Sequence, residues 1–139
     1  MTGAAGFIGA NVARRLLTDG YETTLLTGPG SDCWRLAELE GDAPIVQLDL
    51  ADGDAVSRAV AEARPEWILH LAAHGAYSWQ TDRPAILRTN VIGTANLLEA
   101  GRQADVEAFV NTGSSSEYGL KERAPTEDDD VEPNSAYAE

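Results

Sequence analysis

The sequence has little of what favours binding to nucleic acid or to membranes. Its 139 residues include only 10 lysines and arginines against 23 aspartates and glutamates, giving a formal charge of −13. Nucleic acids and anionic membrane surfaces are bound by basic faces, so this balance argues against both as partners. No apolar run approaches the ~20 residues that a membrane-spanning helix requires. We therefore expect no nucleic-acid partner and no membrane association.

Cysteine is almost absent as well. The single cysteine, Cys33, cannot form an internal disulfide, and no cluster of cysteine and histidine predicts a metal site. The N-terminus lacks the basic start and apolar segment that mark a signal peptide. With 43% hydrophobic and 24% charged residues, the composition is that of one soluble globular domain. We expect a cytoplasmic protein without a bound metal.

What the chain does have is an alternation of short apolar runs with helical patterns. Strands are predicted at 22–27, 45–48, 67–71 and 108–111. Helices are predicted at 7–18, from Ser31 or Asp32 to about residue 40, from Asp52 to about residue 63, and from Pro84 to about residue 101. The alternation predicts βαβ units and a doubly wound parallel α/β sheet with helices on both faces.

Two segments stand out from this alternation. The last predicted helix has Leu87, Val91, Thr94 and Leu98 at helical spacing. Residues 120–139 hold seven of the 23 acids and show no apolar periodicity, which predicts a solvated surface loop. His70 lies inside an apolar strand and is interpreted as a core histidine with satisfied hydrogen bonds.

The first residues form a glycine-rich string, TGAAGFIG at 2–9, that runs directly into a predicted helix. Glycines at 3, 6 and 9 suit a tight turn, a close approach of a pyrophosphate to the backbone, and close packing of the helix. The N-terminus of that helix offers free N–H groups to phosphate. Only two residues precede Gly3, so we expect most of the central strand to be missing and two inner strand edges to be open.

Five motifs together carry a family resemblance: TGAAGFIG at 2–9, LHLAAH at 69–74, NVIGT at 90–94, SSSEYG at 114–119, and Tyr137 in SAYAE. With these, essentially the whole chain resembles the extended short-chain dehydrogenase/reductases. Within them it is most similar to the NAD-dependent epimerase/dehydratase group that acts on nucleotide sugars. The resemblance implies a Rossmann-type fold that binds NAD or NADP.

The resemblance also implies which residues hold the cofactor. They come from the glycine string and from the ends of the successive strands: Gly3, Gly6, Phe7, Ile8, Gly9, Thr27, Asp49, Leu50, Leu71, Ala72, Ala73 and Asn90. Thr27 stands where the family places an acidic residue for the ribose hydroxyls, so nothing there repels a 2′-phosphate. Arg35, in the next helix, could meet such a phosphate or be an ordinary solvated arginine, so both NAD and NADP stay open. Asp49 is equally suited to cap the turn that follows it.

In the family a tyrosine takes the proton of a sugar hydroxyl while hydride leaves for the nicotinamide. Tyr137 resembles that base, and Ser114 resembles the residue that anchors the reacting hydroxyl, with Ser115 as the second choice. A phenol has a pKa near ~10, so it needs a neighbouring cation at neutral pH. The family supplies a lysine four residues on, a position beyond Glu139.

We interpret residues 1–139 as the cofactor-binding domain of such an enzyme, incomplete at both ends and without its C-terminal substrate lobe. The parent enzyme is expected to be a homodimer and an epimerase, dehydratase or ketoreductase of a nucleotide sugar, that is, an isomerase, lyase or oxidoreductase. On its own the chain is expected to be inactive and prone to aggregation. The alternatives are a non-catalytic NAD(P)-binding regulatory module and an inactive gene fragment.

Overall fold

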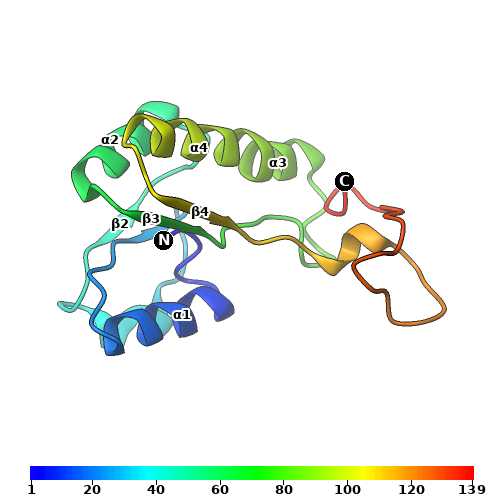
Figure 1. Cartoon of the computed structure of the whole chain (residues 1–139), viewed down its shortest axis with the longest axis horizontal. Coiled ribbons are helices and arrows are strands. Elements are labelled where there is room, and N and C mark those ends of the chain that lie inside the picture. The colour runs from blue at the N-terminus through cyan, green and yellow to red at the C-terminus, as the bar shows by residue number, and fades with distance from the viewer.

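Four short parallel strands form the centre of the computed structural model, which describes residues 1–139 (Figure 1). They are β1 (Leu25–Thr27), β2 (Ile45–Gln47), β3 (Trp67–His70) and β4 (Ala108–Asn111). Strand β1 pairs with β2, and β3 pairs with β4, both in parallel. Thr2 forms bridges to Leu26 on one side and to His70 on the other. The order across the sheet is therefore β2, β1, Thr2, β3, β4, which confirms the predicted doubly wound α/β fold.

The middle of the sheet is occupied by Met1 and Thr2 alone. The Leu26 amide donates to the Met1 carbonyl at 2.8 Å, and the Thr2 amide donates to the Leu69 carbonyl at 2.9 Å. A cavity of about 580 Å³ is lined by these two residues and by the segments that lead into β1 and along β3. The inner edges of β1 and β3 are thus open beside Thr2, as the short segment before Gly3 predicts.

Helices cover both faces of the sheet (Figure 1). Helix α1 (Phe7–Thr18) lies on one face, whereas α2 (Gly53–Ala63), α3 (Arg83–Leu87) and α4 (Gly93–Gln103) lie on the other. A short 3₁₀ helix, η1 (Trp34–Leu39), packs beside α1. None of the helices is long and apolar enough to cross a membrane.

Each face has its own apolar cluster. The α1-face cluster consists of Ala4, Ala10, Ala13, Leu25, Leu36, Leu39 and Ala43. The α4-face cluster consists of Leu26, Leu48, Leu50, Val56, Val60, Ile68, Leu97 and Ala100. The alternation along the strands explains this division, because successive side chains of a strand point to opposite faces.

Local signals placed several boundaries correctly. Helix α1 has the predicted bounds, and Asp52 caps α2 by accepting a hydrogen bond from the Ala55 amide at 3.0 Å. Asp32 accepts from the Trp34 amide at 3.1 Å at the start of η1. The strands are shorter than predicted: β1 begins at Leu25 rather than at residue 22, and β3 ends at His70.

The long helix predicted from Pro84 to residue 101 differs from the structure in two ways. It consists of α3, a π-helical turn η2 (Arg88–Ile92) and α4 in succession. Its buried residues are Ile86, Gly93, Leu97, Ala100 and Gly101, whereas Leu87, Val91 and Leu98 are exposed. The buried face of this helical segment is therefore not the stripe of Leu87, Val91 and Leu98 that the spacing predicts. Leu97 and Ala100 pack in the α4-face cluster, and Ile86 lies beside Gly75.

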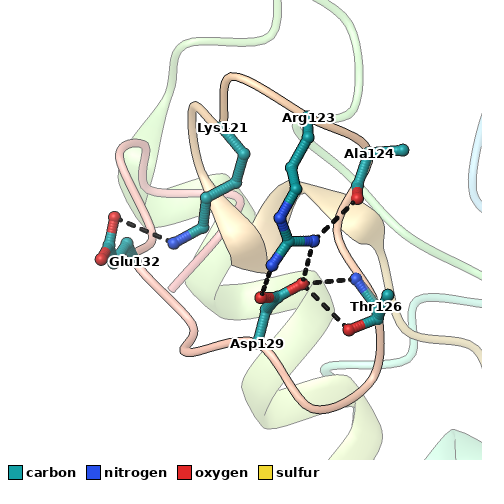
Figure 2. A network of polar contacts seen from close by, with 6 residues as sticks. All are labelled: Lys121, Arg123, Ala124, Thr126, Asp129 and Glu132. Atoms are coloured by element: carbon teal, nitrogen blue, oxygen red, sulfur yellow. Dashed lines mark hydrogen bonds and ion pairs between the residues drawn. The ribbon is translucent and has the colours of Figure 1, made fainter.

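Beyond the 3₁₀ helix η3 (Ser115–Tyr118) the chain has no helix or strand, which confirms the prediction of a surface loop. Polar contacts close this loop on itself (Figure 2). Arg123 pairs with Asp129, which also accepts from the Thr126 amide at 2.6 Å, and Lys121 pairs with Glu132 at 3.1 Å. The Arg123 guanidinium and then the Thr126 amide hold the pKa of Asp129 below its usual range.

Candidate functional site

A cleft of about 410 Å³ lies at the carboxyl ends of the strands. In an open parallel sheet, ligands bind at this edge, where the strand order reverses. Its lining comes from the glycine turn, the residues after β1, β2 and β3, and two positions further on: Thr2, Gly3, Ala5, Gly6, Leu26, Thr27, Gly28, Pro29, Ser31, Leu48, Asp49, Leu50, Leu71, Ala72, Ala73, His74, Gln80 and Thr89. Eight of the twelve predicted cofactor residues are in this set.

The geometry of the turn at residues 3–9 requires glycine at two of its positions. Gly3 has φ +69°, and a Cβ there would lie 2.6 Å from the Ala72 nitrogen, so no side chain fits. A Cβ on Gly9 would collide with the Gly3 carbonyl oxygen, which shows that α1 packs directly on the turn. Gly6 is the N-cap of α1 and lines the cleft.

Phe7, Ile8 and Gly9 do not line the cleft, and the side chain of Phe7 is 72% exposed. Their contribution is the backbone instead. The N–H groups of these three residues have no hydrogen-bond partner in the structure, and the first turn of α1 contains no acidic side chain. An unpaired helix N-terminus of this kind suits a phosphate group.

Thr27 carries an unpartnered polar atom at the edge of the cleft. Its side chain is 4% exposed, and its Oγ1 is a buried oxygen without a hydrogen-bond partner. Buried hydroxyls are nearly always satisfied, so an exception calls for a missing partner. A ribose hydroxyl of a dinucleotide would satisfy Thr27 at the position where the family resemblance expects one. The residues present therefore fit the cofactor.

Asp49 borders the cleft and also stabilises the turn that follows it. Its Oδ1 accepts from the Ala51 amide at 2.9 Å. The other oxygen accepts from Arg88 at 2.9 Å. The hydrogen bond from Arg88, and then that from the Ala51 amide, lower the pKa of Asp49. Leu50 is buried in the α4-face cluster and also borders the cleft.

Asn90 lies outside the cleft and binds the segment Leu71–His74, which forms one wall of the cleft. The Asn90 Oδ1 accepts from the His74 amide at 2.8 Å, and the Asn90 Nδ2 donates to the His74 carbonyl at 2.9 Å. This pair ties the π-helical turn η2 to the segment that follows β3. π-Helical turns within α-helices are frequent at functional sites.

Neither of the two predicted catalytic residues lines the cleft. Ser114 caps η3 by accepting from the Ser116 amide at 3.2 Å. The Tyr137 ring lies beside Gly75, where a Cβ would be 3.3 Å from the Tyr137 Cδ2 atom. Two residues further on, Glu139 pairs with Arg83 at 2.5 Å. No hydrogen bond joins Ser114 to Tyr137, so the structure brings Tyr137 to the loop after β3 but does not assemble the pair.

Some lining residues are not among the predicted cofactor residues. Gln80 accepts from the Gly75 amide at 3.0 Å through its Oε1, and Thr89 borders the cleft from η2. Both reach the cleft through loop and helix geometry that no motif encodes. Arg35, considered as a phosphate ligand, instead stacks on Trp34 at 4.3 Å and lies outside the cleft.

The fold and cleft define a Rossmann-type dinucleotide-binding protein. Comparison with known proteins specifies the family: the model of the NAD dependent epimerase/dehydratase family matches residues 1–139, and the chain belongs to this family.

Three similar proteins illustrate the range of relatives. UDP-glucose 4-epimerase of Mycolicibacterium smegmatis is 40% identical over 99% of this chain and 46% of its own length. dTDP-glucose 4,6-dehydratase of Xanthomonas campestris is 34% identical, covering 99% of this chain and 44% of its own length. The crystal structure of Thermus thermophilus UDP-glucose 4-epimerase with NAD has a TM-score of 0.85 at 32% identity and covers 99% of this chain and 45% of that chain. The chain thus spans less than half the length of these relatives.

Proposed function

We propose that this chain is the cofactor-binding part of an enzyme that performs redox chemistry on a nucleotide sugar. The reaction is an epimerisation, a dehydration or a ketoreduction. The observation that carries the proposal is the cleft at the carboxyl edge. Gly6, which lines it, precedes the free N–H groups at the start of α1, and the unpartnered Thr27 hydroxyl belongs to another lining residue. Phosphate and ribose are the two parts of a dinucleotide that these groups suit.

We propose NAD as the cofactor rather than NADP. No lysine or arginine lines the cleft, and Arg88 is already paired with the cleft residue Asp49 at 2.9 Å. A 2′-phosphate would therefore add negative charge where no unpaired cation lies among the lining residues. The name of the matched family and the NAD complex of the Thermus thermophilus relative support the same choice.

A bound nicotinamide would supply the hydride acceptor for oxidation of the sugar carbinol. Tyr137 is proposed to take the hydroxyl proton, and Ser114 to hold the reacting oxygen by a hydrogen bond. The position of Tyr137 beside Gly75, next to the wall residue His74, supports the first role. The position of Ser114 just after β4, at the same edge of the sheet, supports the second.

Titration calorimetry with NAD⁺ and NADP⁺ tests the proposal on the chain 1–139. The informative variant is Gly6→Asp. Aspartate is a favourable N-cap residue and Gly6 has ordinary extended backbone angles. A Cβ there would lie 3.2 Å from the Gly3 carbonyl oxygen, so the thermal melt of the variant must first show that α1 remains folded. The new carboxylate would face the pyrophosphate, so binding is expected to fall at least tenfold.

The matched control is Gly113→Asp, which adds the same charge where the structure leaves open space. We expect the wild-type chain and this control to bind NAD⁺ equally and to bind NADP⁺ more weakly. Failure of both the chain 1–139 and the full-length protein to bind either dinucleotide refutes the proposal. If Gly6→Asp binds NAD⁺ as tightly as the wild-type chain does, the pyrophosphate does not lie against Gly6.

A non-catalytic NAD-binding module is the second candidate. The separation of Ser114 and Tyr137 from the cleft favours it, because neither side chain is arranged for proton transfer in the structure. Turnover of UDP-glucose or dTDP-glucose by the full-length protein, abolished in Tyr137→Phe, would decide for the enzyme.

We also propose that the full-length protein pairs with a second copy of itself and resides in the cytoplasm. The exposed side chains of Leu87, Val91 and Leu98 form an apolar stripe along α3, η2 and α4, which supports a helix-to-helix interface. Sedimentation of the full-length protein and of its Val91→Asp variant distinguishes a dimer through this stripe from a monomer.

A further inference from the structure

Four polar residues form a connected chain beneath the cleft. Thr2 is 1% exposed and His70 is 3% exposed. The Thr2 Oγ1 lies 2.6 Å from the His70 Nδ1, and the His70 Nε2 lies 2.9 Å from the Thr94 Oγ1. Thr94 Oγ1 contacts the Asn90 carbonyl oxygen at 2.6 Å. We refer to Thr2, His70, Thr94 and Asn90 as the relay.

The proton positions in the relay follow from counting donors and acceptors. A carbonyl oxygen only accepts, so Thr94 must give its single proton to Asn90. Thr94 can then only accept from the ring, which places a proton on the His70 Nε2. The Nδ1 atom of a neutral ring is then an acceptor and receives the Thr2 proton.

A positively charged ring does not fit this count. With protons on both ring nitrogens, Thr2 would accept from His70 and from the Ala72 amide at 3.3 Å, and its own proton would have no acceptor. Burial also lowers the pKa of His70, which favours the neutral ring.

Both ends of the relay meet the wall of the cleft. At one end, the Ala72 amide donates to Thr2. At the other end, Asn90 binds the backbone of His74 in both directions, at 2.8 and 2.9 Å. The residues between these two attachments line the cleft. The relay is therefore hydrogen-bonded to the wall at two points, Ala72 and His74.

We propose that the relay is directed from Thr2 to Asn90 through a neutral His70 protonated on Nε2, and that it positions the wall from Leu71 to His74 for the cofactor. His70 and Thr94 are then positioning residues that act through the wall and touch no ligand themselves. The link to the cofactor rests on the proposed function, whereas the direction of the relay and its hold on the wall do not.

Nitrogen-15 NMR of the histidine rings in the cofactor-free chain tests the direction. The sequence has two histidines, and His74→Gln leaves His70 as the single source of ring signals. We expect a protonated Nε2 and an unprotonated Nδ1 in His70. A ring protonated on Nδ1, or one that exchanges between the two forms, overturns the proposal.

Two variants at Thr94 test the hold on the wall. Thr94→Val removes the hydroxyl, whereas Thr94→Ser keeps it and serves as the matched control. In Thr94→Val we expect the amides of Ala72 and His74 to exchange with solvent at least tenfold faster, relative to amides of α2. We also expect a mixture of His70 tautomers and about fivefold weaker NAD⁺ binding. Thr94→Ser should restore all three properties to within twofold of the wild-type chain.

The outcomes separate the two proposals. If Thr94→Val leaves the tautomer and the wall amides unchanged while lowering thermal stability, Thr94 is merely structural and the relay is refuted. If the wild-type chain shows the expected tautomer and exchange but binds no NAD⁺, the proposed function fails while the relay stands. If Thr94→Val binds NAD⁺ as tightly as the wild-type chain, the relay does not position the wall for the cofactor and that part of the proposal is refuted.

Discussion

Replacing Thr27 by valine should make the chain more stable and a poorer binder of NAD⁺. The Thr27 hydroxyl is buried and has no hydrogen-bond partner, and such a group costs about 1–3 kcal/mol in the folded state. Valine has nearly the same shape, so Thr27→Val removes this cost without leaving a cavity. We expect the free energy of unfolding to rise by about 1 kcal/mol, which corresponds to an increase in Tm of about 4 °C.

The same substitution removes the group proposed to meet the ribose. One net hydrogen bond is worth about 1 kcal/mol, so the Kd for NAD⁺ should rise about fivefold. Stability and affinity therefore change in opposite directions. Differential scanning calorimetry and titration calorimetry measure the two quantities on the same preparation.

Thr94→Val provides the contrast, because the Thr94 hydroxyl accepts from His70 and donates to Asn90. Removing a partnered hydroxyl should lower the free energy of unfolding by about 1–3 kcal/mol. The reasoning about Thr27 is refuted if Thr27→Val destabilises the ligand-free chain as Thr94→Val does. It is equally refuted if the Thr27 variant binds NAD⁺ with unchanged affinity.

Three further predictions concern the turn, the relay and the Asp49 pair. Gly9→Ala should lower the free energy of unfolding by about 1–3 kcal/mol, because the clash of the new Cβ with the turn outweighs the ~1 kcal/mol by which alanine stabilises a helix relative to glycine. Gly113→Ala, the control, should change it by less than about 0.5 kcal/mol. Chemical denaturation measures both. Burial lowers the pKa of His70 below its ordinary 6.5, so the unfolded chain binds more protons and stability falls as the pH drops below that value. The loss should be steeper in the wild-type chain than in His70→Gln, and equal slopes would contradict it. Arg88→Gln should raise the pKa of Asp49 in a carboxyl NMR titration, and an unchanged pKa would show that Arg88 is not its main cause.

Local signals in the sequence predicted what depends on neighbours along the chain. The bounds of α1 and the Asp52 cap follow from spacing and capping within a few residues. The glycine string and the strand ends located eight cleft residues, because the carboxyl ends of parallel strands meet at one edge. The motifs therefore gave the fold and most of the candidate site.

What the sequence could not give depends on contacts between distant residues. Thr2, His70 and Thr94 come from three separate segments, and only the folded sheet and α4 bring their side chains together. His70 was predicted to be a satisfied core histidine, and the hydrogen bonds at both ring nitrogens confirm this. Its partners, however, had no signal. The exposed stripe at Leu87 and Val91 likewise depends on how the helix rotates against the sheet.

The way Thr2 joins the sheet has a consequence for how the molecule opens. Met1 and Thr2 bond to the backbones of both β1 and β3, whereas the α1-face cluster belongs entirely to the β1 side. The α4-face cluster alone spans both sides. The part of the chain made of α1, β1 and η1 is thus a candidate for a subglobal unfolding unit, whose separation the Leu26 and Thr2 amides would report by hydrogen exchange. Thr2 also begins the relay. Separation of β1 from β3 at Thr2 would therefore break the hydrogen bonds that hold the wall of the cleft at the same time.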